Sequence, residues 1–172
     1  FSYDFGASLM EVQQAAVDDL KIPDFIFGIY DQVIAIDHES NELLLMALDE
    51  DDLRAKRKIE KMKQDLLKTI PLVSMGECGV LKSNLTKDQY LEKIGKIHEY
   101  LSAGETYQIN FSQRFAAQCT VDPWELYKRL WANSPAPYSC YFEFPDFQVI
   151  SSSPELLLSK RSKVLVTKPI KG

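Results

Sequence analysis

ETYQINFSQRFAAQ, residues 105–118, is the stretch that indicates the fold class most directly. Apolar and polar side chains alternate along it, which is the period of a β-strand with one buried face. The apolar positions are Tyr107, Ile109, Phe111 and Phe115, and the polar ones are Gln108, Asn110, Ser112 and Arg114. The pattern permits two interpretations: an ordinary half-buried strand, or a strand whose polar face lines a site for a polar ligand.

The flanking sequence predicts three helices and several short strands. Helical spacing of apolar residues and N-terminal capping residues predict helices over about 49–70, 86–103 and 122–134. β-favouring runs separated by turn residues predict a hairpin over 31–48 and four strands within 138–144, 147–153, 156–160 and 163–168. The acidic run DEDD, residues 49–52, is explained by a helix start, so a metal cluster is not needed to account for it. Because helices and strands are segregated along the chain, we predict an α+β fold.

Composition and charge exclude several classes of protein. The chain has 172 residues, of which 45% are hydrophobic and 26% are charged, as in an ordinary soluble globular protein. Its net charge of -5 argues against a nucleic-acid or membrane partner held by bulk electrostatics. No apolar run approaches the ~20 residues of a membrane span. Cys78, Cys119 and Cys140 are far apart and form no C-x-x-C pair, so we expect reduced thiols in a cytoplasmic protein.

Five stretches of the chain are similar, in order and in separation, to the motifs of one enzyme family. They are FSYD at 1–4, YLSAGETYQINFSQRF at 100–115, NSPAPYSCYF at 133–142, SSSPELLL at 151–158 and KPIKG at 168–172. Together they resemble the chorismate-utilising enzymes, a family that includes the anthranilate, aminodeoxychorismate, isochorismate and salicylate synthases. A single stretch is a weak signal, whereas five in register across most of the chain are a strong one.

The resemblance implies a fold and a domain organisation. The expected fold is α+β, a partial anthranilate-synthase-component-I-like fold with antiparallel strands and helices packed outside them. Residues 1–80 are expected to be the end of the N-terminal region, with a hairpin and a long helix, and residues 81–172 the first part of a chorismate-binding domain. Family members are longer, so we expect this chain to be a piece of a larger protein. The resemblance also implies Mg²⁺, with its glutamate ligands outside this chain.

Three positions bear on the reaction that such an enzyme would catalyse. The resemblance places Gln108 where isochorismate-forming relatives have a lysine base. A neutral amide has no basic lone pair, so Gln108 argues against water as the nucleophile. The resemblance makes Glu155 similar to the general acid that protonates the departing 4-hydroxyl of chorismate, since hydroxide is a poor leaving group. It matches Lys171 in PIKG to aminodeoxychorismate-forming members, where other members have alanine.

Lys171 is therefore the candidate nucleophile. Its amine would add at C2 of the ring while the 4-hydroxyl leaves, and ammonia would then attack C4 and expel the lysine, which is covalent catalysis. This requires a neutral amine, which desolvation or neighbouring positive charge can produce, and Lys168 is one candidate source of that charge. The alternative for each of these three positions is an ordinary solvated or structural side chain.

These residues favour one function and leave two others open. The favoured function is the amination of chorismate, of transaminase type, to 4-amino-4-deoxychorismate, a precursor of p-aminobenzoate and folate. The resemblance implies a glutamine amidotransferase subunit as the partner that supplies ammonia, and we expect no nucleic-acid or membrane partner. The alternatives are anthranilate synthase component I activity, against which Lys171 is the main argument, and a non-catalytic binding fragment. We expect the 172 residues alone to be inactive.

Overall fold

The computed structural model describes residues 2–10, 18–69 and 76–170 of the chain. The chain divides into two compact units, Phe1–Ile70 and Pro71–Gly172. The boundary predicted near residue 80 is slightly further along the chain and stays a prediction. Within the described residues, no helix is both long enough and apolar enough to cross a membrane.

The first unit contains a short helix, a hairpin and a longer helix. Their bounds are α1 Tyr3–Leu9, β1 Gln32–Asp37, β2 Glu42–Ala47 and α2 Asp52–Leu66. The hairpin is antiparallel and in regular register from Gln32↔Ala47 to Asp37↔Glu42, which confirms its prediction. The C-terminal end of the helix predicted over 49–70 is less accurate, because α2 ends at Leu66. Its start is as predicted: Asp51 is the N-cap and its side chain accepts a hydrogen bond from the Leu53 N–H.

One lysine ties α2 to the hairpin. Lys58 Nζ lies 2.6 Å from an Asp31 carboxylate oxygen and 2.9 Å from one of Asp49, and it donates to the Leu48 carbonyl at 3.0 Å. The hydrogen bond from Lys58 lowers the pKa of Asp31 and of Asp49, while the hydrogen bonds to both carboxylates raise the pKa of Lys58. Within the acidic run at 49–52, Asp51 thus caps a helix and Asp49 pairs with a lysine.

The second unit begins with a helix between two very short strands. β3 is Lys82–Ser83, α3 is Lys87–Ala103 and β4 is Phe115–Ala116. The start of α3 confirms the predicted capping box: the Thr86 side chain accepts from the Gln89 N–H, and the Gln89 side chain accepts from the Thr86 N–H. Gly104 ends the helix in the left-handed region, with φ of 72°, where a residue with a side chain would be strained.

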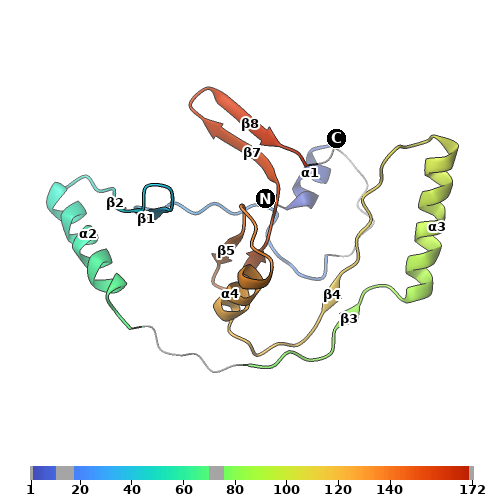
Figure 1. Ribbon diagram of the computed structural model, residues 1–172, viewed down its shortest axis with the longest axis horizontal. Helices are drawn as coiled ribbons and strands as arrows, with labels where there is room; N and C mark the ends of the chain where they lie inside the picture. The colour runs from blue at the N-terminus through green and yellow to red at the C-terminus, as the bar shows by residue number, and fades with distance from the viewer. Residues whose placement is uncertain (1, 11–17, 70–75, 171–172) are drawn as a thin grey trace. The chain divides into compact units, whose positions relative to one another are not determined.

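The rest of the second unit is a helix followed by two hairpins (Figure 1). The bounds are α4 Pro123–Asn133, β5 Cys140–Glu143, β6 Gln148–Ser151, β7 Leu156–Arg161 and β8 Val164–Lys168. β5 pairs with β6 and β7 pairs with β8, both antiparallel, as predicted. α4 packs on the β5–β6 hairpin through Trp124 and Tyr127, whose rings lie 5.2 and 5.9 Å from that of Tyr141. Desolvation in this contact raises the pKa of Tyr141.

The prediction of a long strand over 105–118 is wrong. Only Phe115–Ala116 forms a ladder, with Lys82–Ser83 as its partner, and the residues from 107 to 114 are in no helix or strand. An alternating pattern creates two faces, but a strand also needs a neighbouring strand to accept its hydrogen bonds. The partner β3 is two residues long, so the ladder stops after two pairs. Tyr107, predicted to be buried, is 94% exposed.

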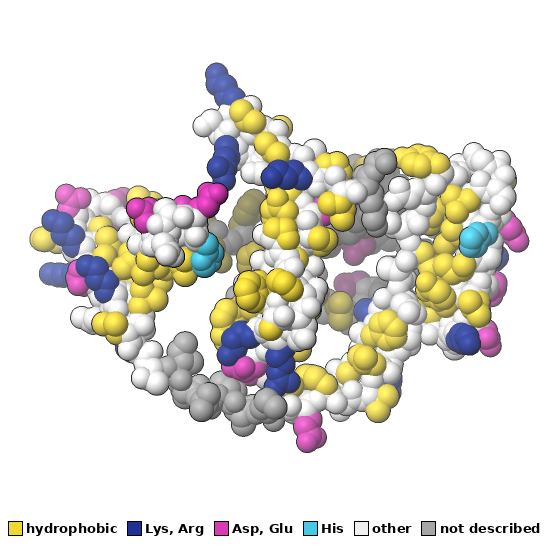
Figure 2. All heavy atoms as spheres, viewed as in Figure 1, with side chains coloured by type: hydrophobic (Ala, Val, Ile, Leu, Met, Phe, Trp, Pro, Cys, Tyr) yellow, Lys and Arg dark blue, Asp and Glu magenta, His cyan; other side chains and the backbone are white. Residues whose placement is uncertain are grey.

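The described residues contain four separate two-stranded sheets, and few of their side chains are buried. Met62 of α2 is the one apolar residue among those described that is buried. A two-stranded sheet offers little area for burying apolar side chains, even where a helix packs on it. Hydrophobic side chains therefore reach the surface on many elements, as the yellow atoms in Figure 2 show. The predicted α+β class, with antiparallel strands, is confirmed.

Two of the three cysteines do not match the prediction of reduced thiols. Cys78 and Cys119 form a disulfide, while Cys140 is free as expected. The physical reason is an antiparallel bridge that brings their Cα atoms to 4.1 Å. It is flanked by hydrogen bonds from the Gly79 N–H to the Gln118 carbonyl and from the Thr120 N–H to the Glu77 carbonyl, both 2.8 Å. Residues opposite one another without mutual hydrogen bonds have their side chains close together.

Reduction of this disulfide is expected to destabilise the second unit. The bond closes a loop of 41 residues around β3, α3 and β4, and closing a loop of that size stabilises by roughly 2–4 kcal/mol through the unfolded state. Cys78→Ser should therefore shift the chemical denaturation midpoint downward, as should dithiothreitol added to the wild type. Cys140→Ser is the matched control and should leave the midpoint unchanged. An equal midpoint with and without reductant would contradict the prediction.

Candidate active site

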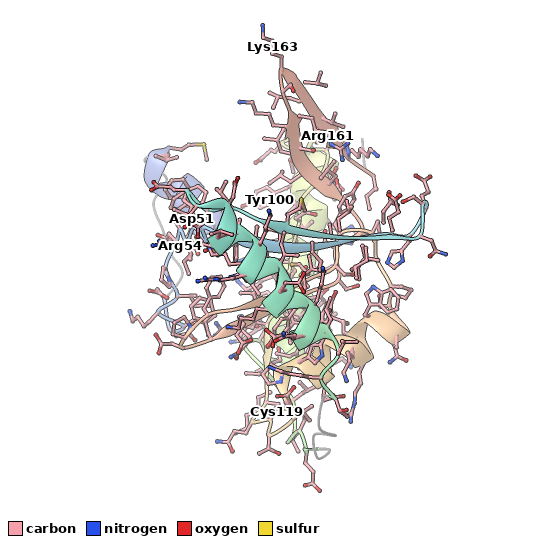
Figure 3. The ribbon with its side chains drawn as sticks, turned by 90° about the vertical axis from the view of Figure 1, so that its left-hand side faces the viewer. Asp51, Arg54, Tyr100, Cys119, Arg161 and Lys163 are labelled. Atoms are coloured by element: carbon pink, nitrogen blue, oxygen red, sulfur yellow. A yellow bond between two sulfur atoms is a disulfide. The ribbon has the colours of Figure 1, made fainter. Side chains whose placement is uncertain are left out.

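The predicted acid, Glu155, lies at the end of the β7–β8 hairpin that is remote from its turn. It directly precedes β7, and its Oε1 accepts a hydrogen bond from the Ile170 N–H at 3.2 Å. The other end of the hairpin carries Arg161 and Lys163 at the turn (Figure 3). Pro169 has no N–H and cannot donate to the ladder. The next N–H along the chain, that of Ile170, is therefore bound by a side chain rather than by a strand.

This contact joins Glu155 to the last residue that the structure describes, Ile170. Lys171 itself lies outside the described residues, and so does Gly172. Its immediate neighbour Ile170 is described and is held by Glu155. The predicted acid is therefore hydrogen-bonded to the residue that precedes the predicted nucleophile. Glu155 Oε1 accepts this bond, and no other hydrogen bond to the carboxylate is present among the described residues.

A β-bulge sets the register at this end of the hairpin. Ser159, Lys160 and Arg161 pair with Val166, Leu165 and Val164, but Leu156 pairs with Lys168, so the register shifts by one residue between Leu156 and Ser159. A shift of one residue moves the side chains beyond it to the opposite face of the ladder. Thr167 opposes the bulge and donates its hydroxyl to the Leu156 carbonyl at 3.4 Å. The face from which Glu155 projects therefore depends on the bulge.

Gln108, the third predicted position, lies in a different segment of the second unit. It follows α3 in the stretch that leads to β4, and its backbone carbonyl accepts a hydrogen bond from the Thr106 hydroxyl at 3.1 Å. Its side chain is exposed. Within residues 76–170, no hydrogen bond joins Gln108 to Glu155. Glu155 is thus hydrogen-bonded to Ile170, the residue before Lys171 in the sequence. The role of Gln108 in the site stays a prediction.

The expected Mg²⁺ has no set of ligands among the described residues. No group of three or more His, Cys, Asp or Glu side chains in those ranges is placed to hold a metal ion. Two or more carboxylates are the usual protein contribution to such a site. This part of the chain alone therefore does not fit the ion, and we derive no chemical step through it.

Comparison with known proteins supplies the family. The model of one protein family, described as chorismate binding enzyme, matches residues 1–172. This chain belongs to that family. Among chorismate binding enzymes, it is 34% identical to aminodeoxychorismate synthase component 1 of Bacillus subtilis over 99% of this chain, and 32% identical to that of Escherichia coli over 100%. It is 29% identical to anthranilate synthase component 1 of Thermus thermophilus over 99% of this chain.

A solved structure of a chorismate binding enzyme gives the same fold. Anthranilate synthase component I from Streptococcus pneumoniae superposes with a TM-score of 0.82, with 21% identity, over 93% of this chain and 39% of that one. The predicted anthranilate-synthase-component-I-like fold is thereby confirmed. The chain spans 38%, 37% and 38% of the lengths of the three relatives named above.

Sequence reasoning missed the contacts that hold Glu155 in place. The proline at 169 is a visible signal that the ladder stops there, because proline cannot donate. No residue in LLLSKR or VLVTK marks the bulge, since neither strand contains the glycine that often accompanies one. The binding of the Ile170 N–H by Glu155 joins residues 15 apart and has no local sequence signal.

Proposed function

We propose that this chain is part of an enzyme that aminates chorismate to 4-amino-4-deoxychorismate. The observation that carries the proposal is Lys171 in the KPIKG stretch, which follows Ile170 in the sequence; the Ile170 N–H is bound by Glu155. Identities of 34% and 32% to two aminodeoxychorismate synthases, against 29% to an anthranilate synthase, support the same choice.

Lys171 would act as the nucleophile of the first step. Its neutral amine adds to C2 of the ring, both conjugated double bonds shift by one position, and the bond from C4 to its hydroxyl breaks. Ammonia then attacks C4, both double bonds shift back, and the C2–nitrogen bond breaks to release the lysine. Each step forms one bond to nitrogen and breaks one bond to oxygen or nitrogen, so the enzyme is regenerated.

Glu155 would supply the proton that lets the hydroxyl leave as water. Hydroxide is a poor leaving group, so a proton has to arrive as the bond breaks. The Ile170 N–H is bound to Oε1 and fixes the carboxyl group relative to the Lys171 segment, which leaves Oε2 to carry the proton. In the second step, the carboxylate so formed can accept a proton from the attacking ammonia.

Gln108 would keep water from acting as the nucleophile. An amide cannot deprotonate water near pH 7, so a site lined by Gln108 has no base of the kind that a lysine would provide. The same property is compatible with ammonia, which is nucleophilic without a base.

The remaining parts of the proposal concern partners and location. A glutamine amidotransferase subunit would deliver ammonia, and Mg²⁺ would bind the carboxylates of chorismate through residues outside this chain. A cytoplasmic location is proposed from the family alone, because the Cys78–Cys119 disulfide removes the argument from reduced thiols. The 172 residues alone are proposed to be inactive, because the binding groups for the ion are not among those described here.

The identity of the product tests the proposed function. The full-length protein would be incubated with chorismate, Mg²⁺ and ammonium, and the product identified by mass spectrometry. We expect 4-amino-4-deoxychorismate. Anthranilate as the product would instead favour the second candidate, anthranilate synthase component I, which the 29% identity to the Thermus thermophilus enzyme keeps in view. Unchanged chorismate would favour the non-catalytic binding protein.

A further inference from the structure

One hydroxyl holds both backbone polar groups of Glu155. The Glu155 N–H donates to Ser153 Oγ at 3.4 Å, and Ser153 Oγ donates to the Glu155 carbonyl at 3.2 Å. A serine hydroxyl can accept and donate at once, so the two bonds are compatible. Pro154, between the two residues, has no N–H of its own to offer. The turn that presents Glu155 therefore depends on the Ser153 side chain.

Ser153 is itself fixed to the β5–β6 side of the unit. Its carbonyl accepts a hydrogen bond from the Tyr138 N–H at 3.1 Å, just before β5. On the other side, the Glu155 carboxylate holds the Ile170 N–H. Hydrogen bonds thus run without interruption from Tyr138, through Ser153 and Glu155, to the residue that precedes Lys171. Glu155 is constrained at its N–H, its carbonyl and its carboxylate.

We propose that Ser153 is a positioning residue for the acid, and that its hydroxyl sets where the Glu155 carboxyl lies relative to the Lys171 segment. The inference rests on the proposed function, because it assigns Ser153 a part in the step that Glu155 performs there. Ser153 does not touch the substrate in this account. Its effect on the rate comes through Glu155, whose proton transfer requires a donor held close to the leaving oxygen.

A neighbouring serine offers a matched control. Ser152 Oγ donates to the Ser134 carbonyl at the end of α4, at 2.5 Å, and makes no hydrogen bond to Glu155 in the described structure. Ser152→Ala and Ser153→Ala each remove one hydroxyl from adjacent residues of the same segment. They differ in whether the lost bonds reach Glu155. Ser153→Thr keeps a hydroxyl at the same position and is the conservative variant.

The test uses the full-length protein and follows chorismate consumption, which is independent of the product formed. Ser153→Ala should lower kcat about tenfold with little change in KM for chorismate, because a displaced acid acts in the transition state rather than in binding. Ser153→Thr should restore most of kcat, and Ser152→Ala should keep it. Hydrogen exchange of the Ile170 amide should become faster in Ser153→Ala and stay slow in Ser152→Ala.

Several results would overturn the proposal. One is an unchanged kcat in Ser153→Ala. Another is an equal fall of kcat in Ser152→Ala, Ser153→Ala and Ser153→Thr, with a fall in the melting temperature of each. That result would indicate general destabilisation. Unchanged exchange at Ile170 in Ser153→Ala would also overturn it. If the wild type forms anthranilate or consumes no chorismate, the proposed function fails, but the exchange comparison still decides whether Ser153 positions Glu155.

Discussion

Lys171→Ala in the full-length protein is expected to lower kcat for formation of 4-amino-4-deoxychorismate by about three orders of magnitude. The reason is the loss of the covalent path, which divides one displacement into two easier steps. A thousandfold fall corresponds to about 4 kcal/mol of lost transition-state stabilisation. The binding of chorismate does not use the amine in this mechanism, so KM should change much less than kcat. The measurement is steady-state product formation followed by mass spectrometry.

The control for this variant is Lys168→Ala. Lys168 lies three residues before Lys171, at the end of β8. Its substitution by alanine removes the same charge from the same stretch of sequence. It should lower kcat far less than Lys171→Ala, even if it contributes positive charge near the nucleophile. An undiminished rate in Lys171→Ala would rule out covalent catalysis by this residue. Equal losses in the two lysine variants would point to a charge effect instead.

Glu155→Gln is expected to lower kcat by about 10²- to 10³-fold, which is within the usual contribution of general acid catalysis. Glutamine keeps the shape of the side chain and an oxygen that can accept from the Ile170 N–H. The variant therefore removes the transferable proton without removing the contact that locates the side chain. Steady-state rates of chorismate consumption and of product formation would measure the loss.

The control here is Glu143→Gln, at the end of β5 in the same unit. Glu143 is an exposed glutamate that plays no part in the proposed reaction, so the kcat of Glu143→Gln should match that of the wild type. A wild-type kcat in Glu155→Gln would show that another group protonates the leaving hydroxyl. The Ser153 comparison would then lose its mechanistic meaning, although the Lys171 result would stand.

Features that depend on neighbouring residues were predictable from the sequence. The capping box at Thr86 and Gln89, the N-cap at Asp122 and the left-handed Gly104 all involve residues within four positions of each other, and all are present. The hairpins were predictable for the same reason, because a turn and two alternating runs lie side by side in the chain. Glu155 became a candidate through the family resemblance, and the sequence did not predict its hydrogen bond to the Ile170 N–H.

Features that depend on distant partners were not predictable. The stretch from 105 to 118 has a convincing strand pattern, but whether it pairs is decided by the length of β3, more than twenty residues away. The Cys78–Cys119 bond requires a bridge between segments on either side of α3. Lys58 gives no sign in the sequence of contacting both Asp31 and Asp49. In each case the contact forms between groups that lie far apart in the sequence and meet only in the folded chain.

The connectivity of the four strand pairs has a consequence for the order in which the chain acquires structure. The pairs β1–β2, β5–β6 and β7–β8 join strands that are consecutive in the chain, and isolated hairpins of this kind close in roughly 1–10 μs. β3–β4 encloses α3 and must bring distant segments together, which slows folding. The hairpin beside Glu155 should therefore form early, and the region of Gln108 should be enclosed last. A chain that refolds from denaturant would therefore form the hairpin beside Glu155 before it closes the segment that carries Gln108.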